Sequence, residues 1–304
     1  METFEISILG CGSALPTTKH FNSAQVVNIH NKLFMIDCGE GAQIQFRKYK
    51  LSFARLNHIF ISHLHGDHCF GLIGLISTPS LLGRTADLHI YGPAPLKEIF
   101  QPQLDFFCKG MTFSVFIHEI NTKEHALIFE DRSVEVWTLP LMHRMPCSGF
   151  LFKEKPVLSH IRKDMIDFYH IPHYKIPLIK AGKDYVTEDG TIVANNRLTF
   201  PADKPRVYAY CSDTCYRNEL VELIKECDLL FHEATFMETH KARANETFHS
   251  TAKDAATIAL QANVKQLAIG HFSARYPNEN VLLEEAQDTF PNTVLVEEGL
   301  TIKI

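Results

Sequence analysis

The sequence lacks the features that mark a membrane-spanning, secreted or nucleic-acid-coating protein. Its longest uncharged stretch, Cys69 to Gly83, is broken by Pro79 and is shorter than the about 20 apolar residues that cross a bilayer. The N-terminus reads Met-Glu-Thr-Phe-Glu, with no basic region before an apolar run, so we expect no secretory signal. The net charge is −5, whereas a protein that coats nucleic acid would be basic. We therefore expect a globular protein without a membrane segment.

Cysteine pairs of the C-x-x-C type are also missing. The eight cysteines are scattered, which disfavours a zinc ribbon or a thioredoxin-like motif. A long chain without a signal needs no disulfides, so we interpret these cysteines as reduced thiols in the cytoplasm. Histidine, in contrast, is abundant, with 17 residues. The informative question is where those histidines lie.

The hydrophobic pattern predicts two halves of different character. The first half contains short alternating strands, such as Phe4–Leu9 and Ala24–Ile29. The second half interleaves apolar strands such as Val207–Tyr210 with helical patterns over Thr251–Gln261 and Glu279–Asp288. Strands interleaved with helices favour an α/β layered fold. We expect each half to give one sheet, with helices outside.

Residues 153–204, between these halves, differ from both. The segment contains four prolines and nine Lys/Arg against seven Asp/Glu, so its net charge is +2 while the rest of the chain is −7. A stretch of this length without clear core periodicity is usually functional, as a lid or a binding arm. The alternative is a surface insertion without a role.

A dense cluster of polar side chains follows the predicted buried strand Asn57–Ser62. His63, His65, Asp67 and His68 lie within six residues, and they cannot all be buried there without partners. Histidine and carboxylate are suitable zinc ligands, and an open coordination position makes such a site catalytic. The spacing fits two ions, because the first two histidines can face one ion and the last two residues another.

Three further apolar strand runs end in a candidate ligand, namely His143, Asp213 or His271. Ligands in α/β sheets gather beyond the carboxyl ends of strands, so we expect these residues to join the cluster. The sequence predicts one zinc ion held by His63, His65 and His143, another held by Asp67, His68 and His271, and a bridging Asp213.

A fifth strand run, Leu229–Phe231, ends in a His-Glu-Ala-Thr motif. We interpret His232 in this motif as hydrogen-bonded across the sheet. His249 directly precedes a predicted helix that Ser250 or Thr251 can cap. Such a cap would hold His249 rigidly, as a catalytic acid or a phosphate contact requires.

With these motifs, the chain resembles the metallo-β-lactamase superfamily, and within it the short-form ribonuclease Z family of tRNA 3′-end processing endonucleases. The resemblance covers nearly the whole chain. The matching segments are 10–17 (GCGSALPT), 37–43 (DCGEGAQ), 62–68 (SHLHGDH) with 70–72, 140–143 (PLMH), 212–214 (SDT), 232–235 (HEAT), 249–251 (HST) and 270–276 (GHFSARY).

The resemblance implies a four-layer αββα sandwich over residues 1–304, with 153–204 as a protruding arm that grips precursor tRNA. It implies two Zn²⁺ ions per chain, with Mn²⁺ as an alternative, and a cytoplasmic homodimer. The implied activity is an endoribonuclease that removes the 3′ trailer and leaves a 3′-hydroxyl. Asp67 would accept a proton from the attacking water. His249 would neutralise the developing charge or protonate the leaving oxygen.

The sequence offers fewer signals for the residues that contact the substrate, and it departs from the family pattern in the arm. The densest basic run outside the arm is Arg47, Lys48, Lys50 and Arg55, a candidate tRNA contact whose alternative is a solvated helix face. The arm of the family usually carries a Gly-Pro motif, whereas this chain reads Tyr-Lys-Ile-Pro at 174–177.

Three other functions were weighed. Another hydrolase of the superfamily, such as a small phosphodiesterase, an arylsulfatase or a lactamase, would leave the arm and the later His-Ser-Thr without a purpose. A flavodiiron protein would have Glu at position 65, where this chain has His. A catalytically inactive RNA-binding module would not need all seven ligands.

Overall fold

The computed structural model describes residues 2–304 in two compact units. Glu2–Lys153 and Arg206–Ile304 form the larger unit, which we call the body. Glu154–Pro205 form the smaller unit, which we call the arm. Within the described residues, no helix combines the length and the apolar character required to cross a membrane.

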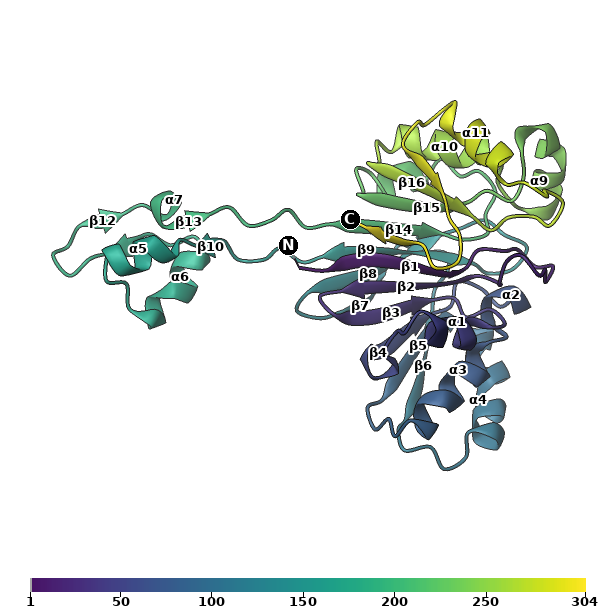
Figure 1. Cartoon of the computed structure of the whole chain (residues 1–304), viewed down its shortest axis with the longest axis horizontal. Coiled ribbons are helices and arrows are strands. Elements are labelled where there is room, and N and C mark those ends of the chain that lie inside the picture. Colours follow the sequence, from purple (N-terminus) through teal and green to yellow (C-terminus); the bar gives the residue numbers. More distant parts are fainter. Residues whose placement is uncertain (1) are drawn as a thin grey trace. The chain divides into compact units, whose positions relative to one another are not determined.

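Two seven-stranded sheets form the body (Figure 1). The first sheet has the order β18 (Thr301–Lys303), β1 (Phe4–Gly10), β2 (Ala24–Ile29), β3 (Lys32–Ile36), β4 (Leu56–Phe60), β5 (Leu88–Pro93) and β6 (Val115–Ile120). The second has the order β17 (Thr293–Leu295), β16 (Gln266–Gly270), β15 (Leu229–Glu233), β14 (Val207–Cys211), β9 (Ser148–Glu154), β8 (Val134–Pro140) and β7 (Leu127–Glu130). Strands β3 to β6 and β14 to β17 pair in parallel, so their carboxyl ends share one edge of each sheet.

The two sheets pack face to face through aromatic side chains, and helices cover their outer faces. Phe34 and Phe60 of the first sheet contact Phe150 and Phe152 of the second at ring-centroid distances of 5.4–5.9 Å. The helices over the first sheet are α1 (Ala42–Lys48), α3 (Leu72–Leu81) and α4 (Pro95–Phe107). Those over the second are α8 (Leu220–Leu223), α10 (Ala252–Gln261) and α11 (Asn280–Gln287). This arrangement confirms the predicted four-layer αββα sandwich. The expectation that each half gives one sheet is wrong in detail, because β7, β8 and β9 of the first half join the second sheet and β18 joins the first.

The arm has a small core of its own. It contains α5 (Lys163–Phe168), α6 (Ile176–Lys180) and α7 (Asn195–Leu198), and two strand pairs, β10 (His160–Ile161) with β13 (Thr199–Phe200) and β11 (Tyr185–Val186) with β12 (Ile192–Val193). Five side chains are buried together: Ile171, Ile179, Tyr185, Val193 and Leu198. The sequence showed no core periodicity here because each element is too short to complete a repeat.

Candidate metal centre

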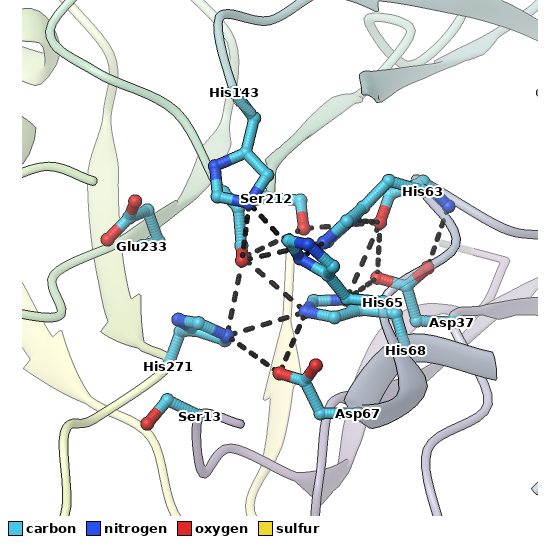
Figure 2. Close-up of polar contacts among 12 residues, drawn as sticks. Ser13, Asp37, His63, His65, Asp67, His68, His143, Ser212, Glu233 and His271 are labelled. Atoms are coloured by element: carbon cyan, nitrogen blue, oxygen red, sulfur yellow. Dashed lines mark hydrogen bonds and ion pairs between the residues drawn. The ribbon is translucent and has the colours of Figure 1, made fainter. Parts of the chain in front are cut away.

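The predicted ligands of the two sheets meet beyond the carboxyl ends of their strands (Figure 2). His63 follows β4, and His65 is the N-cap of the short helix α2 (Gly66–Cys69), which contains Asp67 and His68. On the second sheet, His143 follows β8, Asp213 follows β14 and His271 follows β16. All seven residues predicted from the sequence are therefore brought together.

The first group of ligand atoms surrounds His65 Nδ1. His63 Nε2 lies 3.0 Å and His143 Nε2 lies 3.2 Å from this atom. Asp213 Oδ2 lies 3.6 Å from His63 Nε2 and 3.7 Å from His143 Nε2. Three imidazole nitrogens and one carboxylate oxygen thus face a common point.

The second group shares Asp213 through its other oxygen. His68 Nε2 and His271 Nε2 lie 3.4 and 3.3 Å from Asp213 Oδ1, and 3.3 and 3.4 Å from Asp67 Oδ2. The two histidine nitrogens are 3.4 Å apart. Asp213 therefore turns one oxygen to each group, as a bridging ligand would.

These separations fit a tetrahedral divalent ion. Zinc bonds of about 2.0–2.1 Å to nitrogen and oxygen at tetrahedral angles place two ligand atoms about 3.3–3.4 Å apart. The distances between ligand atoms in the second group match this spacing closely. Those in the first group range from 3.0 to 3.7 Å, on both sides of it. The donor atoms are also those that zinc accepts. The two groups are therefore candidate sites for divalent metal ions.

Buried Asp37 holds the second group in place from behind. Its Oδ2 lies 2.8 Å from His68 Nδ1 and accepts hydrogen bonds from the hydroxyls of Tyr210 and Ser62 at 2.7 and 2.9 Å. A carboxylate on the far nitrogen of a histidine fixes the ring and leaves Nε2 free to bind an ion. His143 is held similarly, because its Nδ1 lies 2.9 Å from the Phe248 carbonyl oxygen.

Glu233, at the end of β15, organises the other side of the centre. Its carboxylate is fully buried and accepts five hydrogen bonds, from the backbone N–H groups of Thr214, Thr235 and Ser250, the Thr235 hydroxyl and His249 Nδ1. The same Thr235 hydroxyl lies 2.9 Å from Nδ1 of His271. Glu233 thus positions His249 directly and His271 through Thr235. Sequence reasoning included Glu233 in a motif but gave it no role.

The pKa directions agree with two anionic ligands at the centre. Burial raises the pKa of Asp213, but the neighbouring His271 and His68 outweigh burial and hold this pKa well below its usual range. Burial also raises the pKa of Asp67, and His68 with His271 again lowers it overall. Burial lowers the pKa of His63, which keeps its imidazole neutral, the form that binds a metal.

His249 lies beside the centre with one nitrogen held. Its Nδ1 is 2.9 Å from Glu233 Oε1, and its ring stacks on that of His271 at 5.5 Å. Burial lowers its pKa, but the Glu233 carboxylate outweighs burial and raises it to about 9. As predicted, a cap at the start of α10 fixes this segment, because Thr251 forms a capping box with Asp254. His232 is buried in β15, but the predicted hydrogen bond across the sheet is wrong: its Nδ1 lies 2.8 Å from the carbonyl oxygen of Glu233, the next residue of the same strand.

A cavity of about 680 Å³ opens over the two groups. Three arginines that the sequence reasoning did not single out line it, namely Arg144, Arg243 and Arg275. Two aromatic rings, Phe70 and Phe236, lie beside them. The three arginines are far apart in the sequence, and of the three only Arg275 belongs to a family motif, GHFSARY at 270–276. The predicted substrate contacts lie elsewhere in the described part of the chain, on α1 and the segment after it, and none lines this cavity: Arg47, Lys48, Lys50 and Arg55.

The chain is similar in sequence and in structure to known proteins. A family model described as Anti-Pycsar protein Apyc1 matches residues 4–165, just over half of the chain, and the chain falls within that family. Ribonuclease Z of Bacteroides fragilis YCH46 is 61% identical over 100% of both chains, and Ribonuclease Z of Bacteroides thetaiotaomicron is 63% identical over 100% of this chain and 96% of its own length.

Solved structures give the same fold. The short form of human tRNase Z has a TM-score of 0.71 and 27% identity, with 98% of each chain covered. The metallo-β-lactamase fold protein YhfI from Bacillus subtilis has a TM-score of 0.70 at 17% identity over 100% of each chain, which supports the fold alone. By its full-length identity to the curated relatives, the chain belongs to the ribonuclease Z family and has the metallo-β-lactamase fold.

Proposed function

We propose that the chain is a zinc-dependent endoribonuclease that removes the 3′ trailer from precursor tRNA and leaves a 3′-hydroxyl on the tRNA. The observation that carries this proposal is the seven-residue ligand set, which lies in a cavity lined by three arginines in a member of the ribonuclease Z family. Arginine is suited to phosphate, because its planar fork donates two parallel hydrogen bonds.

The proposal assigns two Zn²⁺ ions to the centre. His63, His65 and His143 would hold one ion and Asp67, His68 and His271 the other, with Asp213 shared between them. When bound, two such ions lower the pKa of a water and stabilise charge on a phosphoryl oxygen. Asp37, beside Nδ1 of His68, and Thr235, which Glu233 holds beside Nδ1 of His271, would keep these two histidines turned toward their ion.

Asp67 and His249 are the proposed proton carriers. Asp67 lies at the edge of the cavity with its carboxylate in the second group, so it can orient the attacking water and accept its proton. His249 lines the same cavity, and Glu233 holds its Nδ1. Nε2 is then free to donate a proton to the leaving 3′ oxygen, a contribution of general acid catalysis of about 10²–10⁴-fold.

We further propose that the arm binds tRNA. It exposes Phe168, Tyr174 and Phe200, and two of these rings lie beside cations. Lys175 Nζ is 5.5 Å from the Tyr174 ring centre, and the Arg162 guanidinium is 5.4 Å from that of Phe200. Exposed aromatic rings next to basic groups suit RNA, since bases stack on rings while cations contact phosphates.

A homodimer is the proposed assembly. α1, α3 and α4, which pack side by side, expose large apolar side chains that a soluble monomer rarely gathers: Ile44, Leu81, Leu82, Phe106 and Phe107. A second copy of the chain would cover them. Light scattering should report twice the chain mass for the protein, and Phe106→Glu should shift the mass toward that of the monomer. The dimer mass for both proteins would contradict the assignment of this face as the interface.

The test of the activity uses precursor tRNA with a 3′ trailer and a bis(nitrophenyl) phosphate diester as the small substrate. We expect precise removal of the trailer with a 3′-hydroxyl on the tRNA. Cleavage of the small diester without cleavage of the precursor would instead favour another hydrolase of the superfamily. Elemental analysis of the same preparation should find zinc, and full activity with no bound metal would refute the centre.

The arm can be tested by a deletion that respects its geometry. His160 and Phe200 are paired residues on β10 and β13, so residues 161–199 can be replaced by two glycines across adjacent strands. The deletion should raise KM for precursor tRNA, leave the small diester cleaved as before, and flatten the salt dependence of tRNA binding. Equal losses on both substrates would mean that the arm supports the fold or the metal centre, and no loss on either would leave it without a role.

A further inference from the structure

A second cluster of metal-type ligands lies outside the centre used by the proposed reaction. Cys11 Sγ lies 3.3 Å from His20 Nδ1 and 3.6 Å from Glu298 Oε1. His20 Nδ1 is also 3.0 Å from Glu298 Oε2. A thiol and an imidazole nitrogen from residues nine positions apart thus meet a carboxylate from the far end of the sequence.

The cluster is sheltered but reachable. Cys11 is 1% exposed, and the side chains of His20 and Glu298 are each 11% exposed. A cavity of about 160 Å³, lined by Lys19, His20 and Glu279 among others, opens beside it. An ion can therefore enter, while the surrounding protein excludes most of the solvent.

Neighbouring groups orient the ligand atoms toward the shared point. Glu279 Oε1 lies 3.2 Å from His20 Nε2, and Lys19 pairs with the same carboxylate. The backbone N–H of Phe21 donates to Glu298 Oε1 at 2.8 Å. A carboxylate on the far ring nitrogen is the arrangement that fixes a histidine ligand and leaves its other nitrogen available to a metal.

We propose that Cys11, His20 and Glu298 bind a third zinc ion, with the fourth coordination position taken by water. Thiolate, imidazole and carboxylate are all ordinary zinc ligands, with bonds of about 2.3 Å to sulfur and about 2.0–2.2 Å to nitrogen and oxygen. These bonds require separations of about 3.3–3.6 Å between ligand atoms at tetrahedral angles. Cys11 Sγ lies 3.3 Å from His20 Nδ1 and 3.6 Å from Oε1 of Glu298, and the other carboxylate oxygen, Oε2, lies 3.0 Å from His20 Nδ1. On binding, Cys11 loses its thiol proton to solvent, His20 binds through an unprotonated Nδ1, and no other bond is made or broken.

The ion would anchor one wall of the catalytic cavity. Cys11 follows β1, His20 precedes β2, and Glu298 lies before β18. The Cys11 carbonyl accepts a hydrogen bond from Phe272 N at 3.0 Å, and Ser13 N donates to the Phe272 carbonyl at 3.2 Å. This pairing joins the cluster to the residue after the ligand His271. Residues 13–16, which line the catalytic cavity, begin at Ser13 of this pairing.

Cobalt substitution tests the site without relying on activity. The proposed catalytic centre contains no sulfur ligand, so a thiolate-to-cobalt charge-transfer band in the near ultraviolet can arise only where a cysteine binds the ion. We expect this band in the full-length cobalt-loaded protein, and three zinc equivalents per chain in the zinc form. A cobalt-loaded protein without the band would overturn the site, even if trailer removal and the catalytic centre proved correct.

Two variants and one control complete the test. Cys11→Ser should abolish the band and lower the zinc content by one equivalent, and Glu298→Gln should lower the affinity of the same equivalent. Cys108→Ser, which replaces a buried cysteine at the end of α4, should change neither. A band that survives Cys11→Ser, or that disappears in Cys108→Ser, would assign the cobalt to another thiol and refute the proposal.

Discussion

Replacing Glu233 by Gln tests how the buried carboxylate supports the centre. The substitution keeps the shape of the side chain but exchanges one acceptor oxygen for an NH₂ group. Oε1 accepts from Thr214 N, Ser250 N and His249, whereas Oε2 accepts from the N–H and the hydroxyl of Thr235. The amide nitrogen should take the Oε2 side, where the hydroxyl can rotate to accept but the backbone N–H cannot.

The cost can be worked out from these contacts. A buried donor left without a partner costs about 1–3 kcal/mol, and the hydrogen bond between charged partners contributes about 1.5–3 kcal/mol. We expect the variant to be destabilised by about 3–6 kcal/mol in total. Unfolding entropy of about 2.1 cal/mol/K per residue, over 304 residues, converts this to a fall in melting temperature of about 5–9 °C.

Thermal unfolding of the metal-loaded protein measures this shift, with Glu222→Gln as the control. Glu222 lies on the surface, 4.0 Å from Lys225, and its variant should melt within about 1 °C of the parent. Trailer removal by Glu233→Gln should also slow by about 10²–10⁴-fold, because His249 loses the group that orients it. A melting temperature lowered by less than about 2 °C, or an unchanged cleavage rate, would refute the role assigned to Glu233.

The remaining predictions concern the ligands, their supports and one histidine away from the centre. Asp67→Ala should abolish cleavage, because it removes a proposed ligand that is also the proposed proton acceptor. His249→Ala should keep the proposed zinc and slow the chemical step by about 10²–10⁴-fold; zinc lost from this variant would mean that His249 is a ligand. Asp37→Asn should weaken metal binding about 10- to 100-fold, measured by competition with a chelator, and an unchanged affinity would remove Asp37 from the outer shell. Burial, with a smaller effect of His89, lowers the pKa of His58 to about 4, whereas the unfolded side chain titrates at about 6.5. The stability that neutral His58 provides is therefore complete above about pH 6.5 and is lost as the pH falls toward 4. About 2 kcal/mol of it should be gone at pH 5, and His58→Phe should remove this part of the pH dependence of urea unfolding; equal slopes for variant and parent would contradict a neutral, buried His58.

The sequence predicted the metal ligands better than the walls of the cavity, and the reason is physical. Five of the seven candidate ligands lie in the loop that directly follows a strand, and the other two, Asp67 and His68, lie in the short helix α2 that begins at the end of one of these loops. Because the carboxyl ends of parallel strands lie at one edge of a sheet, the strand pattern in the sequence was enough to predict that these residues lie close together. Arg144, Arg243 and Arg275 reach the cavity from loops and from a helix, where only the folded chain decides direction.

Two other features escaped prediction for related reasons. Helix α4 begins with Pro95 and contains Pro102. Proline is common at the first helical position but usually interrupts a helix further along, and no helix was predicted over these residues. Cys11 and Glu298 are separated by 287 positions along the chain and meet only because β18 pairs with β1. No periodicity in the sequence carries that information.

The order in which the ligands occur along the chain bears on the synthesis of the enzyme. His63 comes from the first sheet and His271 from the second, and the first sheet lacks its edge strand until residues 301–303 pair with β1. A growing chain on the ribosome therefore contains six of the seven candidate ligands before His271, the last of them, is synthesised. Domains fold as units when their last elements emerge. Nascent chains that have not reached His271 lack one of the seven candidate ligands, so we expect ribosome-bound fragments to lack the complete candidate metal centre.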